Sequence, residues 1–168
     1  MESMRVGVCV TDDDAIAWSD DPTIDDGDAL VMATSGTTGR AKGVVLTHDA
    51  LQASADSSNR ALGASANDHW LACLPLAHIG GLSVVVRALL GGSKLTVHDG
   101  FEARAVEQSA SEGCNLVSLV PTALRRIDPS LFRTVLLGGS RPPIDRPPNV
   151  IATYGLTETG SGVVYDGR

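Results

Sequence analysis

The sequence of 168 residues is poor in cysteine and contains no long apolar run. Its three cysteines, Cys9, Cys73 and Cys114, are odd in number and widely spaced, so they indicate neither a disulfide framework nor a zinc site. We expect each to be a small buried hydrophobic residue. No apolar stretch reaches the roughly 18 residues of a membrane span, and no signal peptide opens the chain. A soluble, cytoplasmic protein without a membrane partner is therefore expected.

The chain also lacks the basic surplus of a nucleic-acid-binding protein. Its formal net charge is −7, which argues against a nucleic acid or an anionic membrane as partner. Much of the acid lies in residues 1–27, in aspartate runs at 12–14, 20–21 and 25–26. A metal cluster there is conceivable, but such runs are more often solvated. We expect an acidic lead-in, and the chain as a whole is the size of one domain.

The segment Thr34–Gly43 carries most of the chemical information. Its residues include three glycines, four hydroxyl side chains and two cations, and no large apolar side chain. Such a loop can surround an anion with N–H groups, hydroxyls and positive charge, and phosphate is the obvious guest. A Walker loop needs lysine directly after its last glycine, whereas Lys42 precedes Gly43, and a G-x-G-x-x-G fingerprint is absent. The alternative is a flexible surface loop.

Apolar runs alternate with helix-like segments along the chain. The pattern predicts strands at 5–10, 28–34, 70–74, 94–98, 116–120, 134–137 and 150–154, and helices at 48–62, 80–90, 101–111 and 122–127. Thr47 and Gly63 suit the two ends of the helix at 48–62. Four prolines keep a regular helix out of residues 140–149. This order predicts an α/β fold with a mostly parallel sheet flanked by helices.

Several segments with unusual chemistry directly follow predicted strands. They are the Gly/Thr loop, residues 75–78, Gly138-Gly139 and residues 154–158. Ligands of open α/β sheets bind outside the carboxyl ends of the strands. We therefore expect these four segments to face one crevice.

These motifs, in this order, resemble those of the adenylate-forming enzymes, which include acyl-CoA synthetases, adenylation domains and luciferases. Thr34–Gly43 resembles their phosphate loop T-S-G-T-T-G-x-P-K-G, with Ala41 in place of the usual proline. Residues 74–78 resemble L-P-x-x-H, residues 137–140 the G-G-[AS] turn, and residues 154–158 the Y-G-x-T-E segment. The resemblance covers residues 28–168 and implies a partial AMP-binding (adenylation) domain.

The resemblance implies ATP-dependent activation of a carboxylate to an acyl-adenylate, followed by thioester formation with coenzyme A as co-substrate. Lys42 and the loop hydroxyls would hold the β- and γ-phosphates, Thr157 would contact the α-phosphate, and Glu158 would ligate Mg²⁺. Tyr154 would pack against adenine. The implied nucleotide site comprises Thr34, Ser35, Gly36, Thr37, Thr38, Gly39, Lys42, Gly138, Gly139, Ser140, Tyr154, Gly155 and Thr157.

The resemblance also implies an acyl pocket lined by His78, Gly81 and Gly139, with His78 near the reacting carboxylate and acting with Thr157 and Glu158 in catalysis. A histidine beside a helix start is otherwise more often structural. His48, His69 and His98 lack the context of His78, and we interpret them as structural or exposed.

The acid is indicated by a finer likeness. Residues 78–82, Arg87 and residues 162–167 look like those of o-succinylbenzoate–CoA ligases of menaquinone synthesis. A cation within the apolar run 82–90 must reach solvent or an anion. Arg87 is therefore either solvent-facing or directed at the second carboxylate of a dicarboxylate substrate.

The chain ends before other parts of the family pattern: an aspartate for the ribose hydroxyls, a hinge, and a small mobile domain with a catalytic lysine. We expect weak or no complete ligase activity from this chain alone, and the sequence leaves open whether a separate chain supplies the missing domain. The alternatives to an enzyme are a non-catalytic ATP- or AMP-binding module, a degenerate fragment, and an interaction domain with a vestigial loop.

Overall fold

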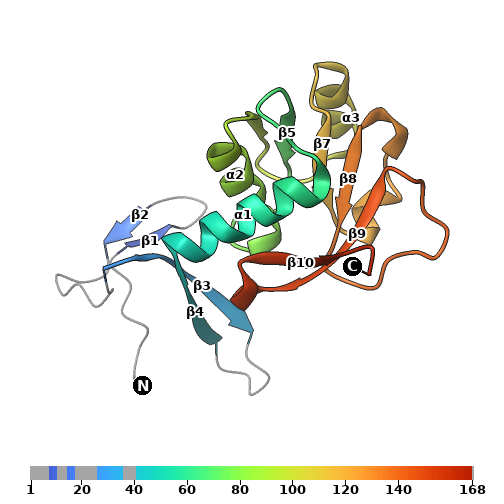
Figure 1. Cartoon of the computed structure of the whole chain (residues 1–168). Coiled ribbons are helices and arrows are strands. Elements are labelled where there is room, and N and C mark those ends of the chain that lie inside the picture. The colour runs from blue at the N-terminus through green and yellow to red at the C-terminus, as the bar shows by residue number, and fades with distance from the viewer. Residues whose placement is uncertain (1–7, 11–14, 18–25, 36–40, 168) are drawn as a thin grey trace.

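A twisted, mostly parallel sheet forms the centre of the fold (Figure 1). The computed structural model describes residues 8–10, 15–17, 26–35 and 41–167. The sheet has six strands in the order β10-β9-β8-β7-β5-β6. Strands β5 to β9 are parallel and β10 runs antiparallel to β9. The strands are β5 (His69–Ala72), β6 (Lys94–Val97), β7 (Leu116–Leu119), β8 (Thr134–Leu137), β9 (Val150–Leu156) and β10 (Ser161–Tyr165). The predicted fold class is confirmed.

The helices lie close to the positions that the sequence predicts. They are α1 (His48–Leu62), α2 (Ile79–Gly91), α3 (Ala103–Ser111) and α4 (Pro121–Leu124), with single 3₁₀ turns η1 (Pro129–Leu131) and η2 (Thr157–Thr159). The N-cap side chain of Thr47 accepts from the Ala50 N–H, and Gly63 ends α1 in the left-handed conformation. No helix forms in the proline-rich connector 140–149. Within the described ranges, none of the helices has the length and apolar character needed to cross a bilayer.

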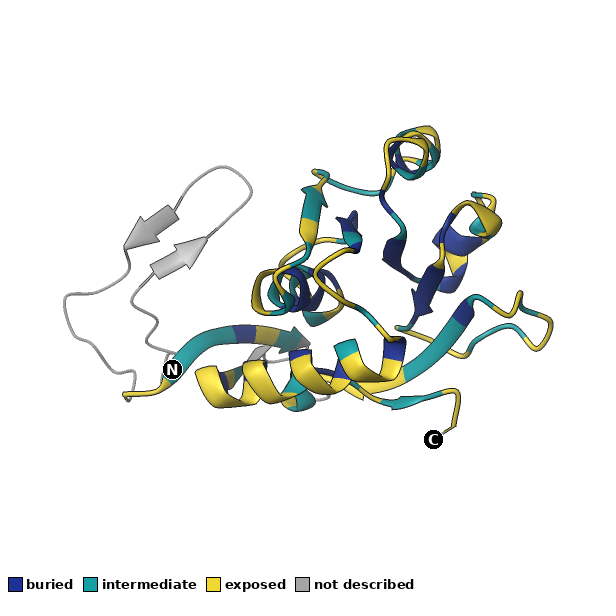
Figure 2. Cartoon of the chain, turned by 45° about the horizontal axis from the view of Figure 1, so that its top comes forward, coloured by how far each residue is buried: buried dark blue, intermediate teal, exposed yellow. Residues whose placement is uncertain are grey.

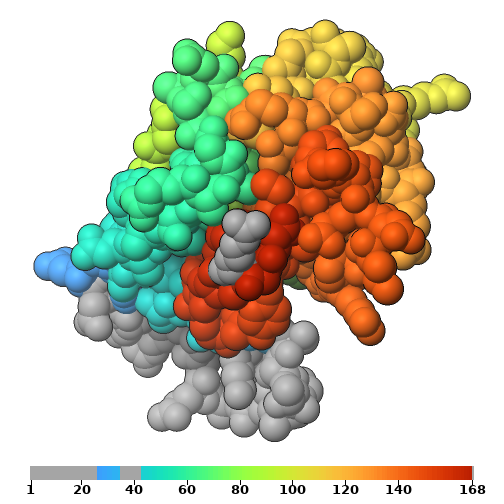
Figure 3. Space-filling view, turned by 45° about the vertical axis from the view of Figure 1, so that its right-hand side comes forward, coloured from blue at the N-terminus to red at the C-terminus, as the bar shows by residue number. Residues whose placement is uncertain are grey.

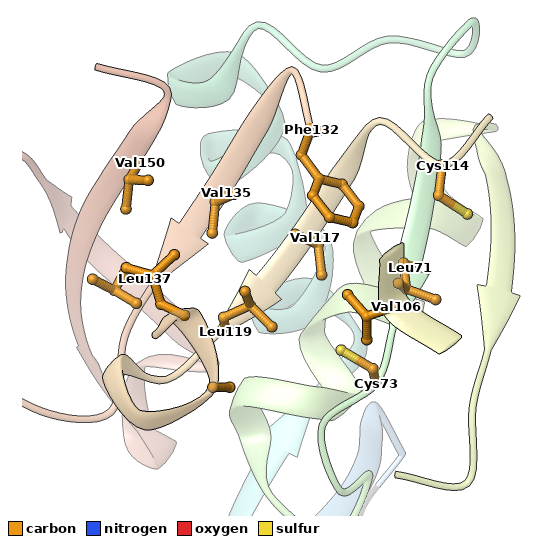
Figure 4. Close-up of a cluster of buried hydrophobic side chains, with 12 residues drawn as sticks. Leu71, Cys73, Val106, Cys114, Val117, Leu119, Phe132, Val135, Leu137 and Val150 are labelled. Carbon is orange, nitrogen blue, oxygen red and sulfur yellow. The ribbon is translucent and has the colours of Figure 1, made fainter. Parts of the chain in front are cut away.

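Two apolar layers cover the two faces of the sheet. Successive strand residues point to opposite faces, so Leu71 of β5 and Cys73, which follows the strand, join one cluster while Trp70 and Ala72 join the other. The first cluster packs against α3 and α4 and is shown in Figure 4. The second lies under α1 and α2. Helix α1 presents one stripe of buried residues to it and an exposed outer face (Figure 2).

Cys73 and Cys114 behave as buried hydrophobic residues, as expected, whereas the side chain of Cys9 lies outside the described part of the chain. Cys73 and Cys114 are free and lie in the first cluster. Burial raises the pKa of the Cys73 thiol to about 11, and burial also raises the pKa of Cys114. Both therefore remain neutral thiols near pH 7.

Two small antiparallel sheets precede the main one and were not fully predicted. Strand β1 (Val8–Val10) pairs with β2 (Ala15–Ala17), so the acidic lead-in contains a hairpin. Strand β3 (Asp28–Ser35) pairs with β4 (Ala41–Thr47). Strand β4 was not predicted: it begins within the Gly/Thr segment and ends at Thr47, directly before the helix at 48–62. The last strand, β10, was also missed, since glycines interrupt its apolar alternation.

A polar cluster joins the strands at the amino edge of the sheet. The Asp68 carboxylate accepts from Asn115 Nδ2 at 2.9 Å and from the Ser65 N–H at 2.8 Å, and pairs with Arg133 at 2.9 Å. Asn115 Oδ1 in turn accepts from the His69 N–H. Burial opposes the ionisation of Asp68, but the hydrogen bonds from Ser65 and Asn115 and the charge of Arg133 outweigh it and lower its pKa.

Replacing Asp68 with asparagine should therefore destabilise the fold. The amide would turn an N–H group toward donors, at a cost of about 1–3 kcal/mol in unfolding free energy. Because the folded pKa lies below the unfolded value, the stabilisation is complete above pH 3.8 and is lost as the pH falls through the folded pKa. Urea unfolding at pH 7 and pH 3 measures this. The exposed Asp99→Asn variant is the control, and an equal deficit at both pH values would contradict the account.

Candidate nucleotide and acid site

Three of the four motif segments lie together at the carboxyl edge of the parallel sheet, as predicted. Residues 75–78 follow β5, Gly138–Ser140 follow β8, and Tyr154–Glu158 form the end of β9 and the turn η2. Strands β9 and β8 are neighbours, and β7 alone separates β8 from β5. The edge therefore brings together residues that are up to about 80 positions apart in the sequence, in the arrangement that α/β proteins use for ligands.

The phosphate-loop motif belongs to the β3–β4 hairpin and not to the parallel sheet. The prediction that this motif follows a strand of the parallel sheet, at its carboxyl edge, is therefore wrong. Thr34 of β3 lies opposite Lys42 of β4, and Ser35 opposite Ala41. The tip, with Gly36, Thr37, Thr38 and Gly39, lies outside the described residues, as do the side chains of Ser35 and Lys42. Strand β4 nevertheless contacts η2, so the hairpin lies beside the Thr157–Glu158 turn.

Glycines allow the C-terminal hairpin β9–β10 to close tightly. A Cβ on Gly155 would lie 2.0 Å from the Ser161 carbonyl oxygen, and a Cβ on Gly162 would lie 2.0 Å from Thr153 Oγ1. Both distances are far below van der Waals contact. The motif glycine Gly155 is therefore required for strand pairing, whatever else it contacts.

The rest of the Y-G-x-T-E segment is accessible. Tyr154 is 63% exposed, and Glu158 is exposed on η2. Thr159 Oγ1 accepts from the Leu156 N–H and lies 2.7 Å from the Ser161 carbonyl oxygen, to which it can donate. These two hydrogen bonds of Thr159 fix the turn that contains Thr157 and Glu158.

The local backbone explains why glycines stand at positions 138 and 139, after β8. Gly139 has φ +82°, which disfavours any residue with a side chain, and its Cβ would come within 3.1 Å of Val120. A Cβ on Gly138 would meet the Thr153 methyl group at 3.2 Å. Ser140 is exposed beside them.

His78 and Gly81 lie where α2 begins. His78 is the N-cap residue of α2, its side chain makes no cap hydrogen bond, and it is exposed. Gly81 is buried, and a Cβ there would lie 2.3 Å from the Pro75 carbonyl oxygen. Because that oxygen belongs to the backbone, only glycine lets α2 pack against the residues that follow β5.

Arg87 is buried, so its interpretation as a solvent-facing helix residue is wrong. Only 2% of it is exposed. Its Nη2 donates to Ser83 Oγ at 3.1 Å and Ser118 Oγ at 3.2 Å, and its Nη1 donates to Ser161 Oγ at 3.3 Å. Its Cζ lies 5.0 Å from the centre of the Trp70 ring. Side chains from α2, β5, β7 and β10 thus meet at one guanidinium.

This guanidinium has no charged partner among the described residues. Its pKa is lowered to about 10 by burial, with an opposing influence from Tyr165. It stays protonated at neutral pH. Arg87 Nε and Trp70 Nε1, both buried, have no hydrogen-bond acceptor in the described part of the chain. A buried positive charge that only hydroxyls solvate is costly, and an anion placed there would be strongly stabilised.

Sequence reasoning missed the partners of this guanidinium. Trp70, Ser118 and Ser161 come from three different strands, and only the register of the sheet brings them to Arg87. Ser83 alone carried a local signal, because it lies one helical turn before Arg87. The other histidines have structural partners or lie on the surface: His69 bonds Thr96, His98 bonds Ser109, and His48 is exposed.

A family model described as AMP-binding enzyme matches residues 6–168. The chain belongs to this family. Among curated relatives, it is 35% identical over 149 residues to the 2-succinylbenzoate–CoA ligase of Bacillus anthracis, covering 79% of this chain and 31% of that protein. It is 38% identical over 145 residues to the ligase of the same name from Lactococcus lactis, covering 79% and 32%.

Solved structures show the same likeness. The o-succinylbenzoate coenzyme A synthetase of Bacillus subtilis, in complex with ATP and magnesium, is 35% identical with a TM-score of 0.72, covering 80% of this chain and 31% of that one. The same synthetase is also known with the acyl-adenylate intermediate OSB-AMP. The chain spans about a third of the length of these relatives.

The two adjacent glycines at the start of α2 give a matched test of the packing. Gly81→Ala should lower the unfolding free energy by about 1–3 kcal/mol, because the new Cβ collides with the Pro75 carbonyl. Gly80→Ala meets nothing within 4 Å and should be neutral, or stabilising by up to about 1 kcal/mol. Thermal unfolding of both variants measures this. Equal effects of the two changes would show that the contact with Pro75 is not constraining.

Proposed function

We propose that this chain forms the ATP-binding and acid-binding part of an AMP-forming acid–thiol ligase whose acid is o-succinylbenzoate. The observation that carries the proposal is the buried, uncompensated guanidinium of Arg87 behind the edge that presents the Y-G-x-T-E segment. Family membership and the names of the relatives support the same activity. Involvement in menaquinone synthesis and a cytoplasmic location remain predictions.

The nucleotide would bind between the β3–β4 hairpin and the η2 turn. Lys42 and the hydroxyls of Ser35, Thr37 and Thr38 would hold the β- and γ-phosphates, and Thr157 would contact the α-phosphate. Contact between β4 and η2 supports this pairing of segments. The exposed ring of Tyr154 would pack against adenine, next to Gly138–Ser140.

The Glu158 carboxylate fits a magnesium ion that also contacts the phosphates. It is exposed on the turn beside the β3–β4 hairpin, which we call the phosphate hairpin. Mg²⁺ binds proteins through one or two carboxylates together with phosphate oxygens and water. When bound, the metal would neutralise charge on the departing pyrophosphate.

In the whole protein, the reaction would be an in-line displacement at the α-phosphorus. A carboxylate oxygen of the acid forms a bond to phosphorus, and the bond to the bridging oxygen breaks to release pyrophosphate. The thiol of coenzyme A then replaces AMP at the acyl carbon. The residues of this chain contribute positioning and charge neutralisation, which account for most of the catalysis in such transfers. His78 would line the acyl pocket near the reacting carboxylate.

The second carboxylate of the acid would be bound by Arg87, directly or through a water molecule. Arg87 Nε has no hydrogen-bond partner among the described residues, and the hydroxyls of Ser118 and Ser161 bind the same guanidinium. Gly81 and Gly139 would let the acyl group approach the backbone. Coenzyme A as co-substrate, and a separate chain that completes the domain, are further parts of this proposal.

Calorimetric titration with Mg-ATP tests the nucleotide site. The chain should bind saturably, and Lys42→Ala should weaken binding by roughly 10- to 100-fold, the loss of one charge-assisted contact. Lys94→Ala is the matched control, because Lys94 is an exposed lysine at the opposite edge of the sheet. Equal binding by the two variants would contradict the assignment of Lys42.

A comparison of two acids tests the role of Arg87. In the presence of Mg-ATP, o-succinylbenzoate should bind more tightly than 3-benzoylpropionate, which lacks the ring carboxylate. Arg87→Met should abolish this preference, and Arg87→Lys should retain part of it, because lysine keeps the charge but not the fork of donors. Competition calorimetry measures both affinities, with melting curves to confirm that each variant is folded. Preference retained in a folded Arg87→Met variant would exclude the guanidinium from acid recognition.

The alternative of a non-catalytic nucleotide-binding module is distinguished by Glu158→Gln. A catalyst should lose acyl-adenylate formation, measured as exchange of labelled pyrophosphate into ATP. A simple binding module should show no exchange before the substitution and should lose mainly the Mg²⁺ dependence of nucleotide binding afterwards.

A further inference from the structure

The side chain of Tyr165 joins three parts of the fold. Its hydroxyl lies in hydrogen-bond contact with Ser58 Oγ of α1 and donates to the Gly162 carbonyl of its own strand β10 at 2.9 Å. Its ring packs against the apolar cluster that contains Trp70. It is also close enough to Arg87 to influence the charge on the guanidinium.

The direction of the two hydrogen bonds is fixed by counting protons. A tyrosine hydroxyl has one proton, and the Gly162 carbonyl can only accept it. Ser58 must therefore donate to the Tyr165 oxygen. Ser58 is completely buried in the C-terminal third of α1, where an unpaired hydroxyl would be costly. The pair is thus a specific link between α1 and β10, two elements that lie side by side in Figure 3.

Helix α1 connects this link to the phosphate hairpin. The helix begins at His48, directly after β4 ends at Thr47, with Thr47 as its cap. Helix α1 also lies beside the end of η2, because a Cβ built on Gly160, the C-cap of η2, would lie 3.5 Å from Ser54 of α1. Any tilt of α1 relative to β10 would therefore move β4, the strand that contains Lys42, away from the Thr157–Glu158 turn.

We propose that Ser58 and Tyr165 are positioning residues that set the separation between the phosphate hairpin and the Thr157–Glu158 turn. This inference rests on the proposed function for its consequence, since these are the two halves of the proposed nucleotide site. Its structural content, that one buried hydrogen bond aligns β4 with η2, does not depend on ligand binding.

The structural content is tested without ligand by NMR of the labelled chain. In the wild type, nuclear Overhauser contacts should connect residues 43–46 with Thr157–Thr159. Ser58→Ala and Tyr165→Phe should each weaken or remove these contacts. Ser57→Ala is the matched control, because Ser57 is the exposed neighbour of Ser58 on α1. Contacts that persist unchanged in folded Ser58→Ala and Tyr165→Phe variants would overturn the proposal.

The functional consequence is tested by Mg-ATP calorimetry on the same variants. Each single substitution should raise Kd by about fivefold, the equivalent of one net hydrogen bond. The double variant should be no worse than either single variant, because both remove the same link. Additive losses would show that each side chain acts separately and would contradict the proposal.

The two tests separate the two claims. If the wild-type chain does not bind Mg-ATP, the proposed function fails for this chain, and the NMR contacts alone decide whether the link aligns β4 with η2. If the chain binds Mg-ATP but Ser58→Ala and Tyr165→Phe change neither the contacts nor Kd, the function stands and the positioning role is wrong.

Discussion

The proposed acid site depends on one charge buried between helix α2 and the sheet. The Arg87 guanidinium is buried against the Trp70 ring and is solvated by hydroxyls of α2, β7 and β10. Burying such a charge is unfavourable unless it is well hydrogen-bonded, and here the Nε–H of Arg87 has no acceptor among the described residues. The fold therefore maintains a position that favours an anion, near the edge where three of the motif segments meet. Under the proposed function, a carboxylate of the acid would be bound there.

Most of the central fold could be predicted because its signals are local. The strand at 134–137 and the helix at 48–62 have the predicted bounds, since each is bounded by turn or cap residues. Strand β4 and strand β10 could not be predicted in the same way. Each follows or contains glycines that break the apolar pattern, and each is stabilised by pairing with the strand before it. Non-local pairing of this kind leaves little trace in the sequence.

In the candidate site too, features with a local sequence signal could be predicted and features that depend on non-local contacts could not. The motifs predicted which segments carry chemistry, and the sheet brings three of them to one edge. The contacts of Arg87 with Ser118 and Ser161 could not be predicted, because they join residues far apart in the chain. The phosphate hairpin reaches the site by contact between β4 and η2, a route that the simple rule of carboxyl edges does not contain. Tertiary register decides these features, and local propensity does not.

The most direct measurement of the central claim is the NMR signal of the Arg87 Nε–H group during titration with o-succinylbenzoate. The account predicts a slowly exchanging signal that shifts on addition of the acid, and a smaller or absent shift with 3-benzoylpropionate, which lacks the second carboxylate. A signal that stays fixed while the amides of Thr157 and Glu158 respond to the acid would contradict it. In that case the acid binds at the edge of the sheet, and the buried guanidinium has a structural role alone.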